Sequence, residues 1–143
     1  MKRLPQHTGS HACFELRLHM VLVTRYRRPV LDAEILVEVR AAFASVLSAW
    51  RCQLIEFGAE ADHVHALIDF HPAIAISELI NNLKSASSKR VGNRYGVRLR
   101  RFYRQPGLWH RAYYVGSVGG ASLEVVRKYV EAQGQEPPSR PPA

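Results

Sequence analysis

Two histidines separated by a single residue, His63 and His65, are the first side chains in this sequence that could perform chemistry together. The segment from His63 to Phe70 alternates in polarity as a half-buried β-strand does. Because side chains alternate across a strand, the two imidazoles share one face, and Val64 lies on the other. Neutral imidazoles side by side can bind one metal ion, so the pair is a candidate metal site. A pair of solvated strand histidines is the alternative.

A tyrosine and a glutamine near the end of the chain could complete such a site. Tyr129 and Gln133 are one helical turn apart and would project from the same face of a helix. A tyrosine hydroxyl can attack a phosphodiester and form a covalent phosphotyrosine, and a glutamine amide oxygen can serve as a third metal ligand. Taken alone, Tyr129 is better explained as an amphipathic residue at the edge of the core. The combination of these residues therefore carries the hypothesis.

The charge of the chain indicates a polyanionic partner. Lysine and arginine number 20 against 12 aspartates and glutamates, which leaves a net charge of +8. Arginine suits phosphate because its planar fork donates two hydrogen bonds at once. The basic residues concentrate in one stretch, from which the candidate DNA-binding residues are Lys84, Lys89, Arg90, Arg94, Arg100, Arg101 and Arg104. A basic face that is merely solvated is the alternative.

Length and composition indicate one folded domain in a reducing compartment. A chain of 143 residues with 47% apolar content can form one hydrophobic core. Residues 1–13 are expected to be a flexible leader, 14–133 the folded domain, and 134–143 a disordered proline-rich tail. Two cysteines are too few for a disulfide framework, and no segment has the pattern of a signal peptide or a membrane span. We therefore expect a cytoplasmic protein.

The elements that must position these residues alternate in a recognisable order. Asp32 is placed to cap a helix whose apolar residues recur at helical spacing as far as Trp50. Glycines 119 and 120 break the chain before a final helix that Ser122 can cap. The expected strands are residues 14–24, 52–57, 63–70 and 108–117, and the expected helices begin after Asp32, after Pro72 and after Ser122.

This order predicts an α+β fold, a ferredoxin-like or RRM-like split βαβ sandwich with one additional C-terminal helix. In such a fold an antiparallel sheet has helices on one face and an open second face, which nucleic-acid-binding proteins often use. Fold alone does not establish function.

Five segments of the sequence carry a resemblance to a known family. They are HMVLVTRYRRPV (19–30), DHVHALIDF (62–70), LKSASSKR (83–90), LWHRAYYVGSVG (108–119) and YVEAQ (129–133). In this order they resemble the small insertion-sequence transposases of the HUH, single-tyrosine class. The resemblance implies that His63 and His65 are the metal-binding pair, Tyr129 the nucleophile and Gln133 the third metal ligand.

The same resemblance implies a substrate and an assembly. Such transposases recognise imperfect hairpins near the ends of their element. They cut single-stranded DNA, leaving a 5′-phosphotyrosine and a free 3′-hydroxyl. It also implies Mg²⁺ as the ion, with Mn²⁺ as a substitute, and a homodimer in which the tyrosine completes the neighbouring active site in trans.

Three other functions are consistent with parts of the pattern. A related HUH nuclease that acts on dispersed palindromic repeats would share the histidines and the tyrosine, and would differ in the DNA bound. A non-catalytic nucleic-acid-binding module using the open sheet would bind without cutting. A metal-dependent hydrolase would use the histidine pair to activate water, and would never become attached to DNA.

Overall fold

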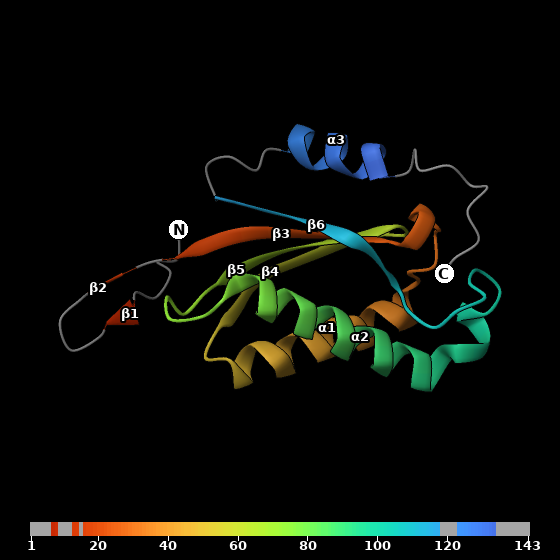
Figure 1. The fold of residues 1–143 in the computed structure, drawn as a ribbon, viewed down its shortest axis with the longest axis horizontal. Coiled ribbons are helices and arrows are strands. Elements are labelled where there is room, and N and C mark those ends of the chain that lie inside the picture. Colours follow the sequence, from red (N-terminus) through yellow and green to blue (C-terminus); the bar gives the residue numbers. More distant parts are fainter. Residues whose placement is uncertain (1–6, 9–12, 15, 118–122, 134–143) are drawn as a thin grey trace.

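A four-stranded antiparallel sheet forms the centre of the protein (Figure 1). The computed structural model describes residues 7–8, 13–14, 16–117 and 123–133. The strands of the sheet are β3 (Arg17–Thr24), β4 (Gln53–Glu60), β5 (His63–Asp69) and β6 (Trp109–Ser117), in the spatial order β4-β5-β3-β6. A separate short ladder pairs β1 (His7–Thr8) with β2 (Cys13–Phe14).

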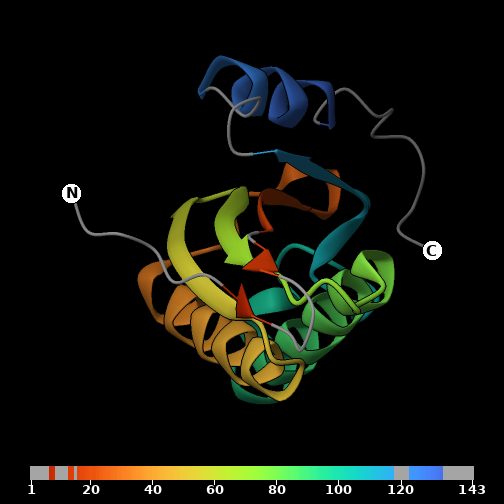
Figure 2. The same cartoon turned by 90° about the vertical axis from the view of Figure 1, so that its left-hand side faces the viewer.

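Helices lie on both sides of this sheet. Helices α1 (Ala33–Ala49) and α2 (Ile76–Leu99) pack side by side against one face, and α3 (Leu123–Gln133) lies over the other (Figures 1 and 2). A single 3₁₀ turn, η1 (Arg25–Arg27), follows β3. The predicted α+β sandwich is therefore confirmed, with one difference. The face expected to be open is partly covered by α3.

Helix α1 begins where its sequence predicts. Asp32 is the N-cap, and its carboxylate accepts a hydrogen bond of 2.9 Å from the amide of Ile35. Ile35, Val39 and Phe43 recur at helical spacing and are fully buried against the sheet. These contacts bury a large apolar area, so the helix gains most of its stability from packing rather than from intrinsic propensity.

Helix α2 extends far beyond the apolar stripe that predicts its start. Inside it, the Ser87 hydroxyl donates to the carbonyl of Leu83 at 2.6 Å and accepts a hydrogen bond of 2.9 Å from Nε1 of Trp109. This buried network joins α2 to β6, and it places Trp109 in the core. None of the helices in the described segments is long and apolar enough to span a membrane.

Alternation along the central strands determines which residues face α3. Met20 and Leu22 of β3, with Val64 of β5, are fully buried on the side of α1 and α2. The predicted alternation of the histidine strand is thus confirmed, and His63 and His65 lie on the opposite face. Strand β4 is longer than the predicted 52–57, because residues 58–60 continue the ladder opposite β5.

Candidate metal and nucleophile site

The two histidines form one pair on the face that α3 covers. Their ring centroids are 6.3 Å apart, with His63 buried and His65 exposed. Although His65 is exposed overall, partial desolvation of its ring by neighbouring atoms lowers its pKa, and the nearby charges of His63 and His19 lower it further. A lowered pKa favours the neutral imidazole, which is the form that binds a metal ion.

Gly58 makes room for the His65 ring. It lies opposite His65 in the β4–β5 ladder. A Cβ atom at residue 58 would lie 2.3 Å from Cε1 and 2.4 Å from Nε2 of that imidazole, closer than such atoms can approach. The glycine therefore permits this orientation of His65.

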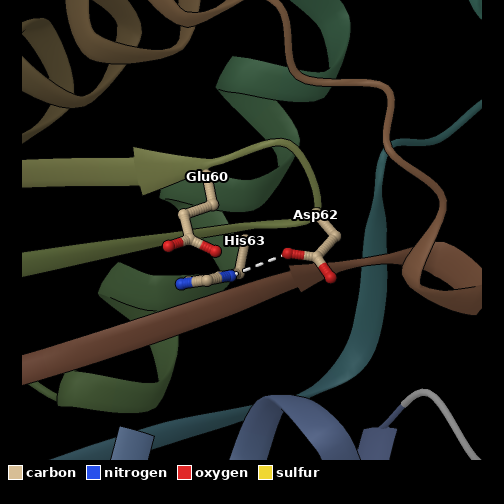
Figure 3. A group of neighbouring side chains, drawn as sticks. All are labelled: Glu60, Asp62 and His63. Carbon is tan, nitrogen blue, oxygen red and sulfur yellow. Dashed lines mark hydrogen bonds and ion pairs between the residues drawn. The ribbon is translucent and has the colours of Figure 1, made fainter. Parts of the chain in front are cut away.

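Two carboxylates flank His63 (Figure 3). Oδ1 of Asp62 lies 2.8 Å from Nδ1 of His63, and Oδ2 of Asp62 lies 3.4 Å from Nε of Arg27. Glu60 pairs with His63 across the ladder, and one potential ligand atom from each of Glu60, Asp62 and His63 lies within 4.8 Å of the others. Two negatively charged side chains therefore lie close to His63.

These residues fit a divalent cation. Two imidazoles share one face, and the adjacent carboxylates supply the negative charge that favours cation binding. Gln133, the third ligand implied by the resemblance, is half-buried at the end of α3. No hydrogen bond joins its amide to either histidine among the described residues. The structure therefore brings the histidines together and leaves Gln133 unengaged with them.

Tyr129 reaches the same face of the sheet. It packs against a small cluster of Val21, Val23 and Val130, and its ring centroid lies 5.8 Å from that of Tyr114. In the β3–β5 ladder Val21 pairs with His65 and Val23 pairs with His63. The tyrosine of α3 is thus packed beside the positions that oppose both histidines.

In this placement Tyr129 is not activated as a nucleophile. Its hydroxyl is buried and has no hydrogen-bond partner among the described residues. Burial raises the pKa of Tyr129 to about 12. A phenol with a raised pKa is a weaker attacking group at neutral pH, because the phenolate is the reactive form.

Three of the seven predicted DNA-binding side chains make contacts within the fold. Nζ of Lys84 donates to the carbonyl oxygen of Arg111 at 2.9 Å, and burial lowers the pKa of this lysine. Arg90 and Arg94 donate to the two carboxylate oxygens of Glu38 at 3.1 and 2.9 Å. Glu38 is 5% exposed, so these arginines neutralise a buried charge and tie α2 to α1.

The other four basic residues lie on the second half of α2 and on the loop that follows it. Lys89, Arg100 and Arg104 line a hollow of about 630 Å³ between the second half of α2 and the following loop. Arg101 is exposed on the same bend. Positive charge thus surrounds a concave surface large enough for part of a nucleotide chain.

Several residues of the site do not emerge from the sequence pattern. Glu60 is missed because residues 58–62 are expected to form a loop. Extending the strand to residue 60 would have paired Glu60 with His63 and Gly58 with His65. Asp62 precedes His63 directly, but its hydrogen bond to that ring has no signal in the spacing. Glu38 on α1 gives no sequence signal of its contact with α2.

A histidine pair on the face of a four-stranded antiparallel sheet, below a C-terminal helix that carries a tyrosine, defines the HUH single-tyrosine class of transposases. The family model described as "Transposase IS200 like" matches residues 12–133, and the chain belongs to this family.

Individual relatives agree with this assignment. The transposase of insertion sequence element IS200 from Salmonella typhimurium is 29% identical over 131 residues, covering 89% of this chain and 82% of that protein. The ISDra2 transposase TnpA from Deinococcus radiodurans is 25% identical over 130 residues, covering 91% and 92%.

Solved structures share the fold. A crystal structure described as a transposase from Deinococcus radiodurans aligns with a TM-score of 0.81 at 23% identity, covering 89% of this chain and 97% of that one. A REP-associated tyrosine transposase bound to a REP hairpin aligns with a TM-score of 0.55 at 12% identity, covering 87% and 69%.

Proposed function

We propose that this protein is a metal-dependent transposase that binds hairpins in single-stranded DNA, cleaves through a 5′-phosphotyrosine and rejoins the strands. The observation that carries the proposal is the placement of His63, His65 and Tyr129 on one face of the sheet. Membership of the IS200-like family supports the same activity. An ordinary binding module would have no need of this combination.

The chemistry requires one exchange of phosphate ester bonds. The phenolic oxygen of Tyr129 attacks phosphorus, and the bond from phosphorus to the 3′ oxygen breaks. The proton lost by the phenol is balanced by the proton that the departing 3′ oxygen gains, so no further reagent is consumed. A 3′-hydroxyl later attacks the phosphotyrosine and restores the DNA backbone.

The residues of the sheet prepare this step. His63 and His65 would hold the ion, with Gln133 joining them when α3 moves toward the pair. When bound, Mg²⁺, or Mn²⁺ in its place, supplies a Lewis acid that stabilises the negative charge developing on the phosphate. Tyr129 must leave its apolar contacts with Val21 and Val23, since its buried hydroxyl cannot reach a phosphate there.

In this proposal the DNA binds the basic surface formed by the second half of α2 and the loop that follows it. Lys89, Arg100 and Arg104 surround the hollow, and Arg101 adds to the same positive surface. One structural neighbour, a REP-associated tyrosine transposase, is bound to a REP hairpin. A hairpin near the element's end is the corresponding substrate proposed for this protein.

We also propose a homodimer acting in the cytoplasm, in which residues 14–133 form the catalytic domain and each site is completed by the partner's tyrosine. The predicted tail at 134–143, the Ser122 cap and the glycines at 119 and 120 lie outside the described residues. So does most of the predicted leader, apart from strand β1 (His7–Thr8) within it and Cys13 of strand β2 at its end.

The test is the detection of a covalent protein–DNA adduct. A single-stranded oligonucleotide carrying an element end is labelled on the 3′ side of the cut and incubated with the protein and Mn²⁺. The label should migrate with the wild-type protein on a denaturing gel. Tyr129→Phe should bind the same DNA and form no adduct, because only the attacking oxygen is removed.

Tyr114→Phe is the matched control, since its ring contacts Tyr129 and it too loses one hydroxyl. This variant should still form the adduct. An adduct that persists in Tyr129→Phe would show that another residue attacks. Cleavage without any adduct would favour a hydrolase, and binding without cleavage would favour a recognition module.

A further inference from the structure

Asp62 lies in the turn between β4 and β5, and it is held through both its side chain and its main chain. Its Oδ1 lies 2.8 Å from Nδ1 of His63, and its Oδ2 lies 3.4 Å from Nε of Arg27 (Figure 3 shows the contact with His63). The backbone carbonyl of Asp62 accepts hydrogen bonds from the amide and the hydroxyl of Thr24, at 3.0 and 3.1 Å. Each carboxylate oxygen therefore has a separate partner.

The turn that carries Arg27 adopts an unusual backbone conformation. Tyr26 and Arg27 have φ values of 55° and 50°, in the left-handed region that residues with side chains rarely occupy. Such conformations persist where surrounding contacts hold them, and they concentrate at functional sites. The contact between Arg27 and Asp62 is one contact that holds this turn.

We propose that Asp62 is a positioning residue for the metal centre, an inference that rests on the proposed function. In a neutral imidazole only one ring nitrogen carries hydrogen. By accepting a hydrogen bond from Nδ1 of His63, the Asp62 carboxylate keeps the proton on that nitrogen and leaves Nε2 free to bind the ion. A carboxylate behind a metal-binding histidine fixes its orientation and its tautomer in this way.

Asp62 does not itself act as a ligand. Glu60, Asp62 and His63 lie close enough together to suggest an ion bound among them. However, the hydrogen bond occupies both Nδ1 of His63 and Oδ1 of Asp62, and Arg27 engages Oδ2. An ion bound by Asp62 would have to displace one of these contacts. The arrangement instead leaves the opposite nitrogen of His63 free to bind an ion.

Calorimetric titration of the full-length, DNA-free protein with Mn²⁺ tests this role. Asp62→Ala should weaken binding about 10- to 100-fold, as loss of an orienting partner does. Asp62→Asn should weaken it less, because the amide oxygen can still accept from Nδ1–H. Glu60→Gln is the matched control for the lost charge, and its effect should be no more than about fivefold.

The nitrogen chemical shifts of His63 provide a readout that needs neither metal nor DNA. In ¹⁵N spectra recorded where imidazole is neutral, the wild type, Asp62→Asn and Glu60→Gln should carry the proton on Nδ1. Asp62→Ala should move population to the Nε2–H tautomer. Circular dichroism verifies folding, and Asp62→Asn supplies the comparison if Asp62→Ala does not fold.

Two results would overturn the inference. The first is that Asp62→Ala binds Mn²⁺ as tightly as the wild type and keeps the same His63 tautomer. If Asp62→Ala does not fold, the equivalent result is that both the wild type and Asp62→Asn carry the His63 proton on Nε2. The second is that Glu60→Gln loses as much Mn²⁺ affinity as Asp62→Ala does, which would indicate that the carboxylates bind the ion directly. Failure of the adduct experiment would leave the tautomer result standing, so the two proposals fail separately.

Discussion

The rings of Tyr129 and Tyr114 pack against each other across the interface between α3 and β6, with centroids 5.8 Å apart. This contact, together with Val21 and Val23, covers the Tyr129 hydroxyl and leaves it without a hydrogen-bond partner among the described residues. The residue assigned as nucleophile is thus stored in an apolar setting beside the histidine pair. The proposed attack on DNA would require this hydroxyl to leave its apolar contacts.

Burial of this hydroxyl predicts a specific pH dependence. The pKa of Tyr129 is raised from 10.0 to about 12 in the folded protein, so the unfolded chain loses this proton first as pH rises. The protonated Tyr129 hydroxyl therefore contributes fully to the free energy of unfolding below about pH 10. This contribution is lost as the pH rises toward about 12. Urea denaturation across this range should show a shallower decline for Tyr129→Phe than for the wild type.

Tyrosinate absorbance provides the direct measurement. Tyr103 also has a pKa raised to about 12 by burial, so it should remain in the late phase when Tyr129 is replaced. The amplitude of that phase should fall in Tyr129→Phe and stay detectable. An unchanged late phase would mean that the Tyr129 hydroxyl is accessible to solvent before DNA binds.

Gly58→Ala should disable the site while leaving the fold intact. The new methyl group would lie 2.3 Å from Cε1 of His65, so the imidazole must rotate away. Mn²⁺ affinity should fall about 10- to 100-fold, a loss comparable to that of a metal site with a misplaced ligand. Gly92→Ala is the control, since a Cβ there meets nothing within 4 Å.

Gly92 lies in α2, where alanine should raise the free energy of unfolding by about 0.5–1 kcal/mol without changing metal affinity. Equal Mn²⁺ affinity in Gly58→Ala and the wild type would show that His65 does not need its observed orientation.

Loss of either histidine should separate DNA binding from cleavage. His63→Ala and His65→Ala should abolish adduct formation, whereas hairpin affinity should change little, because the basic surface lies at the end of α2. Excess chelator should have the same effect on the wild type. Mobility-shift and denaturing gels measure the two properties side by side. Undiminished cleavage in chelator would remove the metal from the mechanism.

The arginines should divide into two groups by their effects. Replacing Arg100 and Arg101 with alanine should weaken hairpin binding and flatten its dependence on salt by about 1.4 in log–log slope, since each phosphate contact with a single strand contributes about 0.7. Stability should be unchanged, because both side chains are exposed. Fluorescence anisotropy over a salt series measures this slope. An unchanged slope would move the DNA surface elsewhere.

Replacing Arg90 and Arg94 together should instead lower the free energy of unfolding by on the order of 2 kcal/mol. The reason is that Glu38, which is 5% exposed, loses both of its arginine partners. Urea denaturation measures the difference. Stability equal to that of the wild type would show that these ion pairs contribute nothing.

Mixing inactive chains tests the shared active site. His63→Ala and Tyr129→Phe chains are each expected to be inactive alone. If the tyrosine acts in trans, a heterodimer contains one site with both defects and one with neither, so about half of the wild-type activity per dimer should return. Purification through two different affinity tags verifies the heterodimer. No recovery would indicate that each subunit uses its own tyrosine.

Local patterns predicted the parts of the fold that depend on neighbouring residues. The alternation from His63 onward placed the histidine pair on the correct face, and Asp32 marked the start of α1. These features follow from the periods of strand and helix and from a cap three residues from its partner. The assigned roles of Tyr129 and Gln133 stay predictions.

The features that the sequence pattern did not predict depend on contacts between residues far apart in the chain. The polar second half of α2 is held to α1 through Glu38, whose partners lie 52 and 56 residues away. Glu60 joins the site only because β4 extends along β5. Tyr26 and Arg27 likewise have positive φ values where Arg27 contacts Asp62. Neither residue is a glycine, so the sequence does not predict this backbone conformation.

The basic hollow and the histidine pair lie on different sides of the sheet. The hollow lies against α2, whereas the histidines lie on the far face of the sheet. On the side of α2 the sheet ends at β6, which is an edge strand. Under the proposed function, a strand whose hairpin is held at the hollow would pass around that edge to reach the histidines. The distance around the edge would then set a minimum number of nucleotides between the hairpin and the scissile bond.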